Sequence, residues 1–108
     1  MRLASGVWVS AYLTRLRLAD IPAFVVAGGD ETAGAVLVKL NTLDGNAKAF
    51  QRSFDMMTGE RTWMVLAEGV EHDVDVSVAK QRSFDSDLWV IEVEDRQGRT
   101  LLDEDGLS

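Results

Sequence analysis

The chain of 108 residues contains no cysteine, one histidine and one proline. Without cysteine it can form neither disulfide bonds nor thiolate metal sites, and the single His72 excludes a site with several histidine ligands. No apolar run approaches the roughly 18–20 residues that span a bilayer. The apolar stretch 7–13 is followed by arginines rather than by a small-residue cleavage pattern, so we interpret it as part of a helix and not as a signal peptide.

Positive charge is also scarce, because 11 lysines and arginines face 18 acidic residues and leave a net charge of −7. This charge opposes binding to nucleic acid or to an anionic membrane surface. The length and a hydrophobic fraction of 46% predict one folded domain over residues 1–108. We expect its acidic end, residues 103–108, to fray.

The segment 85–96 carries the clearest strand pattern in the chain. Trp89, Ile91 and Val93 alternate with Glu92 and Glu94, which is typical of a strand with one buried face. We therefore predict a strand over residues 88–94, with its tryptophan side beneath the helices of the domain.

Two helices and four further strands are predicted. The first helix covers residues 6–20, with Ser5 as its N-cap, and its apolar arc is wide enough for burial on two sides. The second covers residues 71–85, because acidic residues stand at its start and Lys80 and Arg82 near its end, although alternating valines there would also suit a strand. The strands are predicted over residues 23–27, 35–42, 47–54 and 61–67.

Together these elements predict an α+β fold. The four strands would form an antiparallel meander, extended by a fifth strand at 88–94, with both helices packed on one face. The strand 23–27 is wholly apolar, which predicts a central place in the sheet. The glycine-containing segment 28–34 predicts a hairpin loop, because it lacks the lysine and hydroxyl pair of a phosphate-binding loop.

Three separated blocks, residues 9–13, 29–39 and 84–95, resemble in order an uncharacterised alphaproteobacterial family, domain-of-unknown-function family 1491. Arg15 and Trp63 also match the pattern of that family, whereas Ser86 stands where the pattern has proline. The resemblance covers nearly the whole chain and favours a helix ending near Arg82. It implies a bacterial cytoplasmic protein and supplies no function.

Two acidic groups could in principle bind a metal. Asp85, Asp87, Glu92 and Glu94 could form a paired-carboxylate or Mg²⁺ site, or the two aspartates could cap a turn while the glutamates face solvent. Residues 71–75, which include His72, could also gather ligands. The simpler interpretation is a negatively charged first helical turn.

Two arginines stand among aromatic residues. Arg15 follows Tyr12 by three positions and Trp8 by seven, and Arg52 shares a strand face with Phe50. Each could stack on an aromatic ring or pair with the row of Glu92, or could anchor an anion in a groove. The candidate ligand-binding residues are Arg15, Arg52, Asp87, Trp89, Glu92 and Glu94, and we predict no catalytic residue, metal ligand or cofactor.

The leading hypothesis for function is a non-catalytic module that binds a protein partner or a second copy of itself. It rests on the wide apolar arc of the first helix and on three tryptophans in a small chain. The alternative is a small-ligand or metal-binding enzyme that uses the carboxylates at 85–94. Nucleic-acid binding ranks last because of the negative charge, and the expected location is the cytoplasm.

Overall fold

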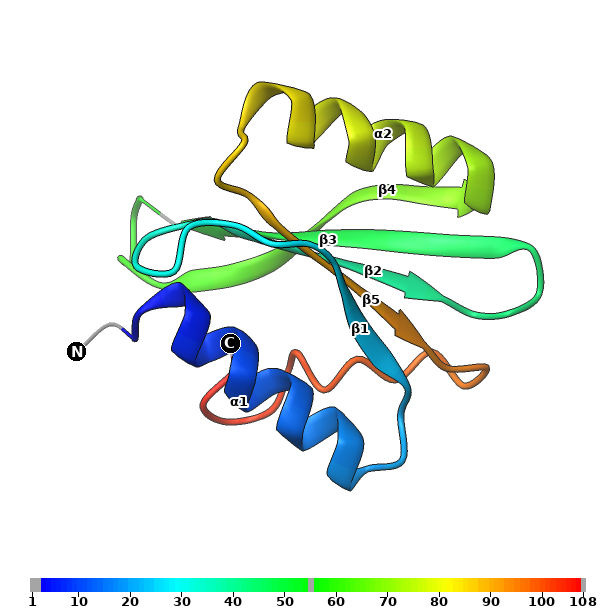
Figure 1. Ribbon diagram of the computed structural model, residues 1–108, viewed down its shortest axis with the longest axis horizontal. Helices are drawn as coiled ribbons and strands as arrows, with labels where there is room; N and C mark the ends of the chain where they lie inside the picture. The colour runs from blue at the N-terminus through cyan, green and yellow to red at the C-terminus, as the bar shows by residue number, and fades with distance from the viewer. Residues whose placement is uncertain (1–2, 55, 108) are drawn as a thin grey trace.

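Five strands form one mixed sheet in the computed structural model, which describes residues 3–54 and 56–107. Figure 1 shows the sheet with one helix above it and one below. The elements in chain order are α1 (Ser5–Leu18), β1 (Ala23–Ala27), β2 (Val36–Asn41), β3 (Asn46–Phe54), β4 (Arg61–Val70), α2 (Glu71–Phe84) and β5 (Trp89–Glu94). The predicted α+β class, the second helix and the strand at 88–94 are therefore confirmed.

The predicted meander is wrong in its strand order, which is β1-β5-β2-β3-β4. Strand β5 lies between β1 and β2 and runs parallel to β2, while the other neighbouring pairs are antiparallel. Parallel neighbours need a long connection, and the β3–β4 hairpin followed by α2 provides it. β5 can occupy the centre because Val90, on the face opposite Trp89, is also buried.

The apolar sequence of β1 predicted a place at the centre of the sheet, and this prediction is wrong. Strand β1 lies at an edge. The segment 28–35 is accordingly no hairpin loop, because it carries the chain past β5 from β1 to β2. Gly29 has no side chain where the loop passes the Asp87 carbonyl oxygen, and a Cβ there would collide with that oxygen. The Trp89 indole Nε1 then donates a hydrogen bond to the Asp30 carbonyl oxygen over 2.8 Å.

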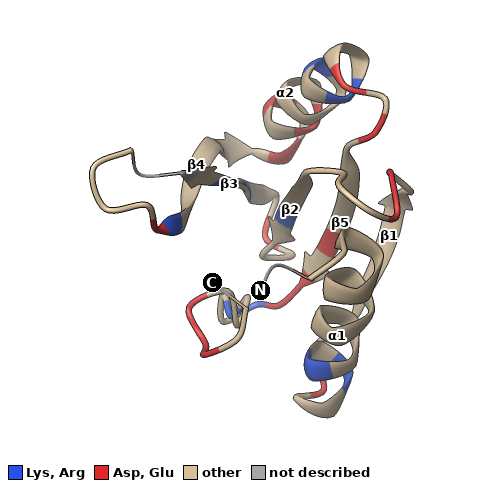
Figure 2. Ribbon diagram, turned by 90° about the vertical axis from the view of Figure 1, so that its left-hand side faces the viewer, with Lys and Arg blue, Asp and Glu red and all other residues tan. Residues whose placement is uncertain are grey.

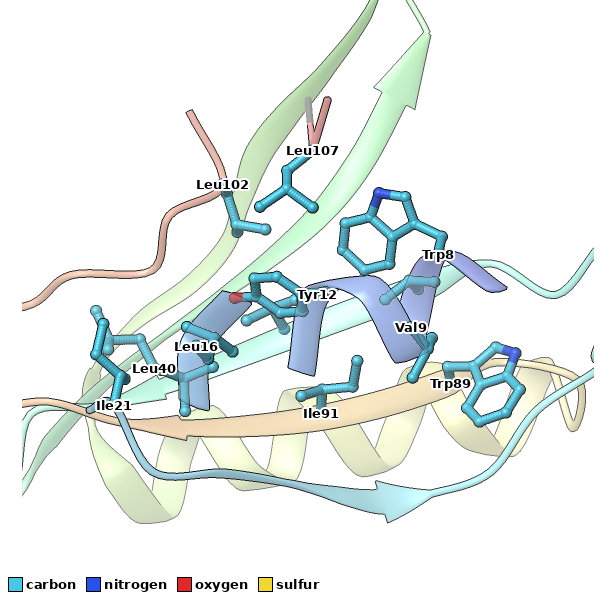
Figure 3. Close-up of a cluster of buried hydrophobic side chains, with 13 residues drawn as sticks. Trp8, Val9, Tyr12, Leu16, Ile21, Leu40, Trp89, Ile91, Leu102 and Leu107 are labelled. Carbon is cyan, nitrogen blue, oxygen red and sulfur yellow. The ribbon is translucent and has the colours of Figure 1, made fainter. Parts of the chain in front are cut away.

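The two helices cover opposite faces of the sheet, so the prediction that both pack on one face is wrong (Figure 1). Helix α1 covers the face of Trp89, Ile91 and Val93, and Figure 3 shows its Trp8, Val9, Tyr12 and Leu16 in that cluster. Helix α2 covers the other face through Val74 and Val78, which pack with Leu37 and Val90. Strand β2 is consequently buried on both faces, and on β5 only Glu92 and Glu94 remain partly exposed. Neither helix of the described chain has the length and apolar run needed to cross a membrane.

Helix α1 begins one residue before the predicted start and has no side-chain cap. Ser5 is its first residue, and the Ser5 Oγ donates to the Gly34 carbonyl oxygen over 2.6 Å instead of capping the helix. The helix ends at Leu18, before the predicted limit, because Asp20 adopts a φ of 59° and Pro22 follows.

The C-terminal segment is packed and not frayed over the residues that the structure describes; Ser108 lies outside them. The Leu107 side chain is 1% exposed and joins the α1 cluster together with Leu102 (Figure 3). The Trp63 Nε1 donates to the Leu107 carbonyl oxygen over 3.2 Å, and the Arg15 Nη1 to that of Asp105 over 2.7 Å. This segment covers the part of the sheet that α1 leaves open.

Candidate functional site

A buried lysine lies on β2, the middle strand of the sheet. The Lys39 side chain is 6% exposed and lies on the face covered by α2. Its Nζ lies 2.7 Å from the Glu71 Oε2, 2.6 Å from the Asp75 Oδ1 and 3.2 Å from the Glu92 Oε1. We call Lys39, Glu71, Asp75 and Glu92 the lysine cluster. Figure 2 shows the single basic residue of β2 in blue and the acidic residues of the neighbouring β5 in red.

Sheet register and helix spacing build the lysine cluster. Lys39 and Glu92 are neighbours in the parallel β2–β5 pair, so their side chains leave the same face. Glu71 and Asp75 stand four residues apart on α2 and therefore share the helix side that meets the sheet. The Asn41 Nδ2 also donates to the Glu71 Oε2 over 3.0 Å.

Lys39 was not among the predicted site residues, because a lysine that alternates with the apolar Val38 and Leu40 is expected on the solvent face of a strand. The signal that could have found it is the apolar Leu37 on the same face, two positions away. The cluster holds one ammonium and three carboxylates, which leaves an excess of two negative charges. Glu92 is thus bound to a cation and is not half of an open carboxylate pair. Among the described residues, no group of three or more acids or histidines is placed to hold a metal ion.

The folded state stabilises the charged form of Lys39. Burial lowers the pKa of Lys39, but its hydrogen bonds with Asp75, Glu71 and Glu92 outweigh burial, so the net pKa is raised above the ordinary 10.5. A pKa that is raised in the folded state stabilises the fold fully below the unfolded value, and this stabilisation is lost as the pH rises toward the folded value.

We therefore expect the free energy of unfolding to decline above pH 10.5 more steeply for the wild-type protein than for Lys39→Met. Urea denaturation across neutral to alkaline pH measures the difference between the two. The buried Tyr12, whose pKa burial also raises, contributes to both proteins and cancels in that difference. Parallel curves through the alkaline range would contradict this role of Lys39.

The six residues predicted as ligand-binding do not meet in one site. Glu92 and Glu94 leave the sheet face under α2, and Trp89 leaves the opposite face. Asp87 lies in the turn before β5, where its backbone N–H donates to the Asp85 Oδ1 over 3.0 Å, so the side chain of Asp85 supports this turn. Arg15 holds the C-terminal segment, with its Nη1 3.9 Å from the Glu104 Oε1 as well.

Arg52 lies over two aromatic rings, as the aromatic interpretation predicted, and both rings belong to tryptophans. Its guanidinium carbon lies 4.9 Å from the ring centre of Trp8 and 4.9 Å from that of Trp63. Trp63 is the cross-strand partner of Arg52, and α1 brings Trp8 over the same face. The long-range contact with Trp8 could not be seen in the pattern of β3 alone.

These features define a three-layer α+β protein, with a mixed five-stranded sheet between two helices, a lysine cluster on one face and a tryptophan–arginine stack on the other. The chain belongs to the DUF1491 family, described as a protein of unknown function, which matches residues 3–103. The resemblance seen in the sequence is thereby confirmed.

Solved structures of relatives share this fold. A crystal structure of a DUF1491 family protein from Caulobacter crescentus CB15 has 38% sequence identity and a TM-score of 0.87, over 95% of this chain and 97% of that chain. An NMR structure of a DUF1491 family protein from the same organism has 39% identity and a TM-score of 0.83, over 96% of each chain. The solution structure of protein Atu0922 from A. tumefaciens has 32% identity and a TM-score of 0.73, over 87% of this chain and 86% of that chain. No curated protein matches the chain.

Proposed function

We propose that this protein is a non-catalytic association module that pairs with a second copy of itself through β1. The observation that carries the proposal is the exposure of an apolar edge strand: Phe24, Val25 and Val26 all lie open to solvent. An edge strand presents unpaired backbone N–H and C=O groups that can continue a sheet into another chain.

The distribution of charge makes the β1 edge a more favourable interface between two copies than the rest of the surface. Two copies that each carry a net charge of −7 repel one another, and contact is least opposed where neither copy carries charge. Strand β1 contains no charged residue, and Figure 2 shows it free of both colours. A twofold axis beside β1 would pair it with its own copy in the antiparallel sense, so that Phe24 and Val26 of the two copies bury one another.

The strand is open because α2 lies over β3 and β4, and only Ala27 at the end of β1 packs on the cluster beneath α2. Phe24 pairs with Glu92 and shares its sheet face, whereas α2 packs against Leu66 and Ala67 toward the other edge. Strand β1 has only five residues and an irregularity between Val25 and Ala27, and both features weaken an edge contact. We therefore expect a weak dimer, with a dissociation constant roughly in the micromolar range.

Val26→Lys is expected to shift the protein to a monomer, because a charge at the centre of the edge would meet its own copy across the twofold axis. Sedimentation velocity over a range of concentrations measures the change. Val76→Lys is the matched control: Val26 and Val76 are each 56% exposed, but Val76 lies on α2. Dimerisation lost equally in both variants, or a wild-type protein that stays monomeric throughout, would rule the proposal out.

The alternative of a metal or ligand enzyme built on the carboxylates at 85–94 is less well supported. Its central acid, Glu92, is bound to Lys39, and Asp87 lies in the turn before the strand. The cytoplasmic location stays a proposal and rests on the family resemblance.

A further inference from the structure

One side of α1 faces the open edge of the sheet. Gly6, Ser10, Leu13 and Arg17 recur at helical spacing and therefore lie along a single side of the helix. Leu13 and Arg17 line a cavity of about 510 Å³ together with Ala23, the first residue of β1. This side of α1 is consequently the one turned toward the β1 edge, and we call its four residues the edge flank.

The guanidinium of Arg17, at one end of the edge flank, is free to pair with another molecule. Arg17 is exposed, and among the described residues its side chain makes neither an ion pair nor a hydrogen bond. Asp20 lines the same cavity but forms no ion pair with it. The other arginine of α1, Arg15, is held by the Asp105 carbonyl oxygen.

A carboxylate lies at the other end of the edge flank. The Glu31 carboxylate occupies the place where a side chain at position 6 would project, so a Cβ on Gly6 would collide with it. Glu31 is exposed, and its carboxylate has no cation as partner in the described part of the chain. The neighbouring Asp30 instead accepts hydrogen bonds from the backbone N–H groups of Thr32 and Ala33. Each copy thus presents a base and an acid at opposite ends of one flank.

Helix α1 and strand β1 run antiparallel to one another, side by side (Figure 1). The Ile21 N–H donates to the Leu16 carbonyl oxygen at the turn into β1, and beyond β1 the Gly6 N–H donates to the Glu31 carbonyl oxygen. The middle of β1 therefore lies level with the middle of the edge flank. A twofold axis there sets the two α1 helices antiparallel, with Gly6 of one copy opposite Arg17 of the other.

From this placement we infer that Arg17 of each copy forms an ion pair with Glu31 of the other, at both ends of the β1 interface. These pairs presuppose the proposed pairing through β1, and they hold the two copies in one register, because complementary charges select how two surfaces meet. The cavity beside Arg17 leaves room for the incoming carboxylate. A parallel arrangement of the two helices would instead bring Arg17 against Arg17.

Mixing two variants tests whether these ion pairs form between copies. Arg17→Glu places two acids together at both ends of its own dimer, and Glu31→Arg places two bases together. Each variant alone should therefore dimerise about tenfold more weakly than the wild-type protein. In a mixed dimer opposite charges meet again at both ends, so an equimolar mixture should associate nearly as tightly as the wild type. Sedimentation velocity over a range of concentrations measures the dissociation constants.

Lys80→Glu mixed with Glu31→Arg is the charge-matched control, because Lys80 is exposed and lies on α2. If this mixture associates as tightly as Arg17→Glu with Glu31→Arg, the effect is one of general charge and the ion pairs are overturned. If Glu31→Arg does not fold, Glu31→Gln replaces it. Arg17→Glu should then bind Glu31→Gln more tightly than it binds itself, because one ion pair is regained and no acids face each other.

Two further results distinguish the ion pairs from the β1 pairing itself. A wild-type protein that stays monomeric at every concentration would overturn both proposals. A dimer that Val26→Lys disrupts but Arg17→Glu leaves unchanged would overturn the ion pairs alone.

Discussion

Replacing Lys39 with methionine is expected to lower the free energy of unfolding by about 2–3 kcal/mol. Methionine keeps the apolar stem but leaves Glu71, Asp75 and Glu92 without their shared cation. This loss of stability should be smaller than the loss from breaking a fully buried ion pair, because Glu71 and Asp75 are partly exposed and water screens them. Glu92, with a side chain 15% exposed, should carry most of the cost. Chemical denaturation measures the change.

Two further variants test whether the loss comes from charge. Glu92→Gln, added to Lys39→Met, should restore part of the stability, because it removes the most deeply buried of the unpaired charges. Lys48→Met is the control: the Lys48 Nζ lies 3.5 Å from the Glu68 Oε2 in an exposed pair, and such pairs contribute about 0–1 kcal/mol. Equal losses in the Lys39 and Lys48 variants would contradict a structural role for the lysine cluster.

Leu107→Ala is expected to lower the free energy of unfolding by about 3 kcal/mol, although this residue stands next to the last in the chain. Leu107 is 1% exposed and packs in the core with Leu102 and Tyr12, so its truncation leaves a cavity that the core must fill or leave empty. Thermal or urea unfolding measures the effect.

Leu18→Ala is the control for this prediction, because Leu18 is 79% exposed at the end of α1 and the same truncation should cost less than about 0.5 kcal/mol. A loss at Leu107 no greater than that at Leu18 would mean that the C-terminal segment is not part of the core. Proteolysis should agree with the denaturation result, since a docked segment is protected from cleavage.

Local patterns predicted the elements well where they were strong. The strand at 88–94 follows from the alternation around Trp89, and α2 follows from the acids at its start and the bases near its end. The same patterns misled where two tertiary arrangements share one local sequence. An apolar strand such as β1 is compatible with the centre of a sheet, where it is buried, and also with an edge. In the structure β1 lies at the edge.

Of the candidate site residues, some could be recognised in the sequence and others could not. Arg52 was found because a guanidinium beside aromatic residues is recognisable in sequence, yet its partners Trp8 and Trp63 come from distant elements. Lys39 was missed because a lysine that alternates with valines predicts solvent unless the second face of the strand is known to be covered.

The sequence alone determined the acidic charge of this protein, the approximate positions of its helices and strands, its family, and the absence of thiol chemistry. Only the tertiary structure decided which strands are neighbours, that the helices take opposite faces, and which charges and indole groups are buried. The physical reason is that a two-residue period says which side chains share a face of a strand. This period carries no information about which element packs on that face, because packing between segments far apart in the sequence decides that.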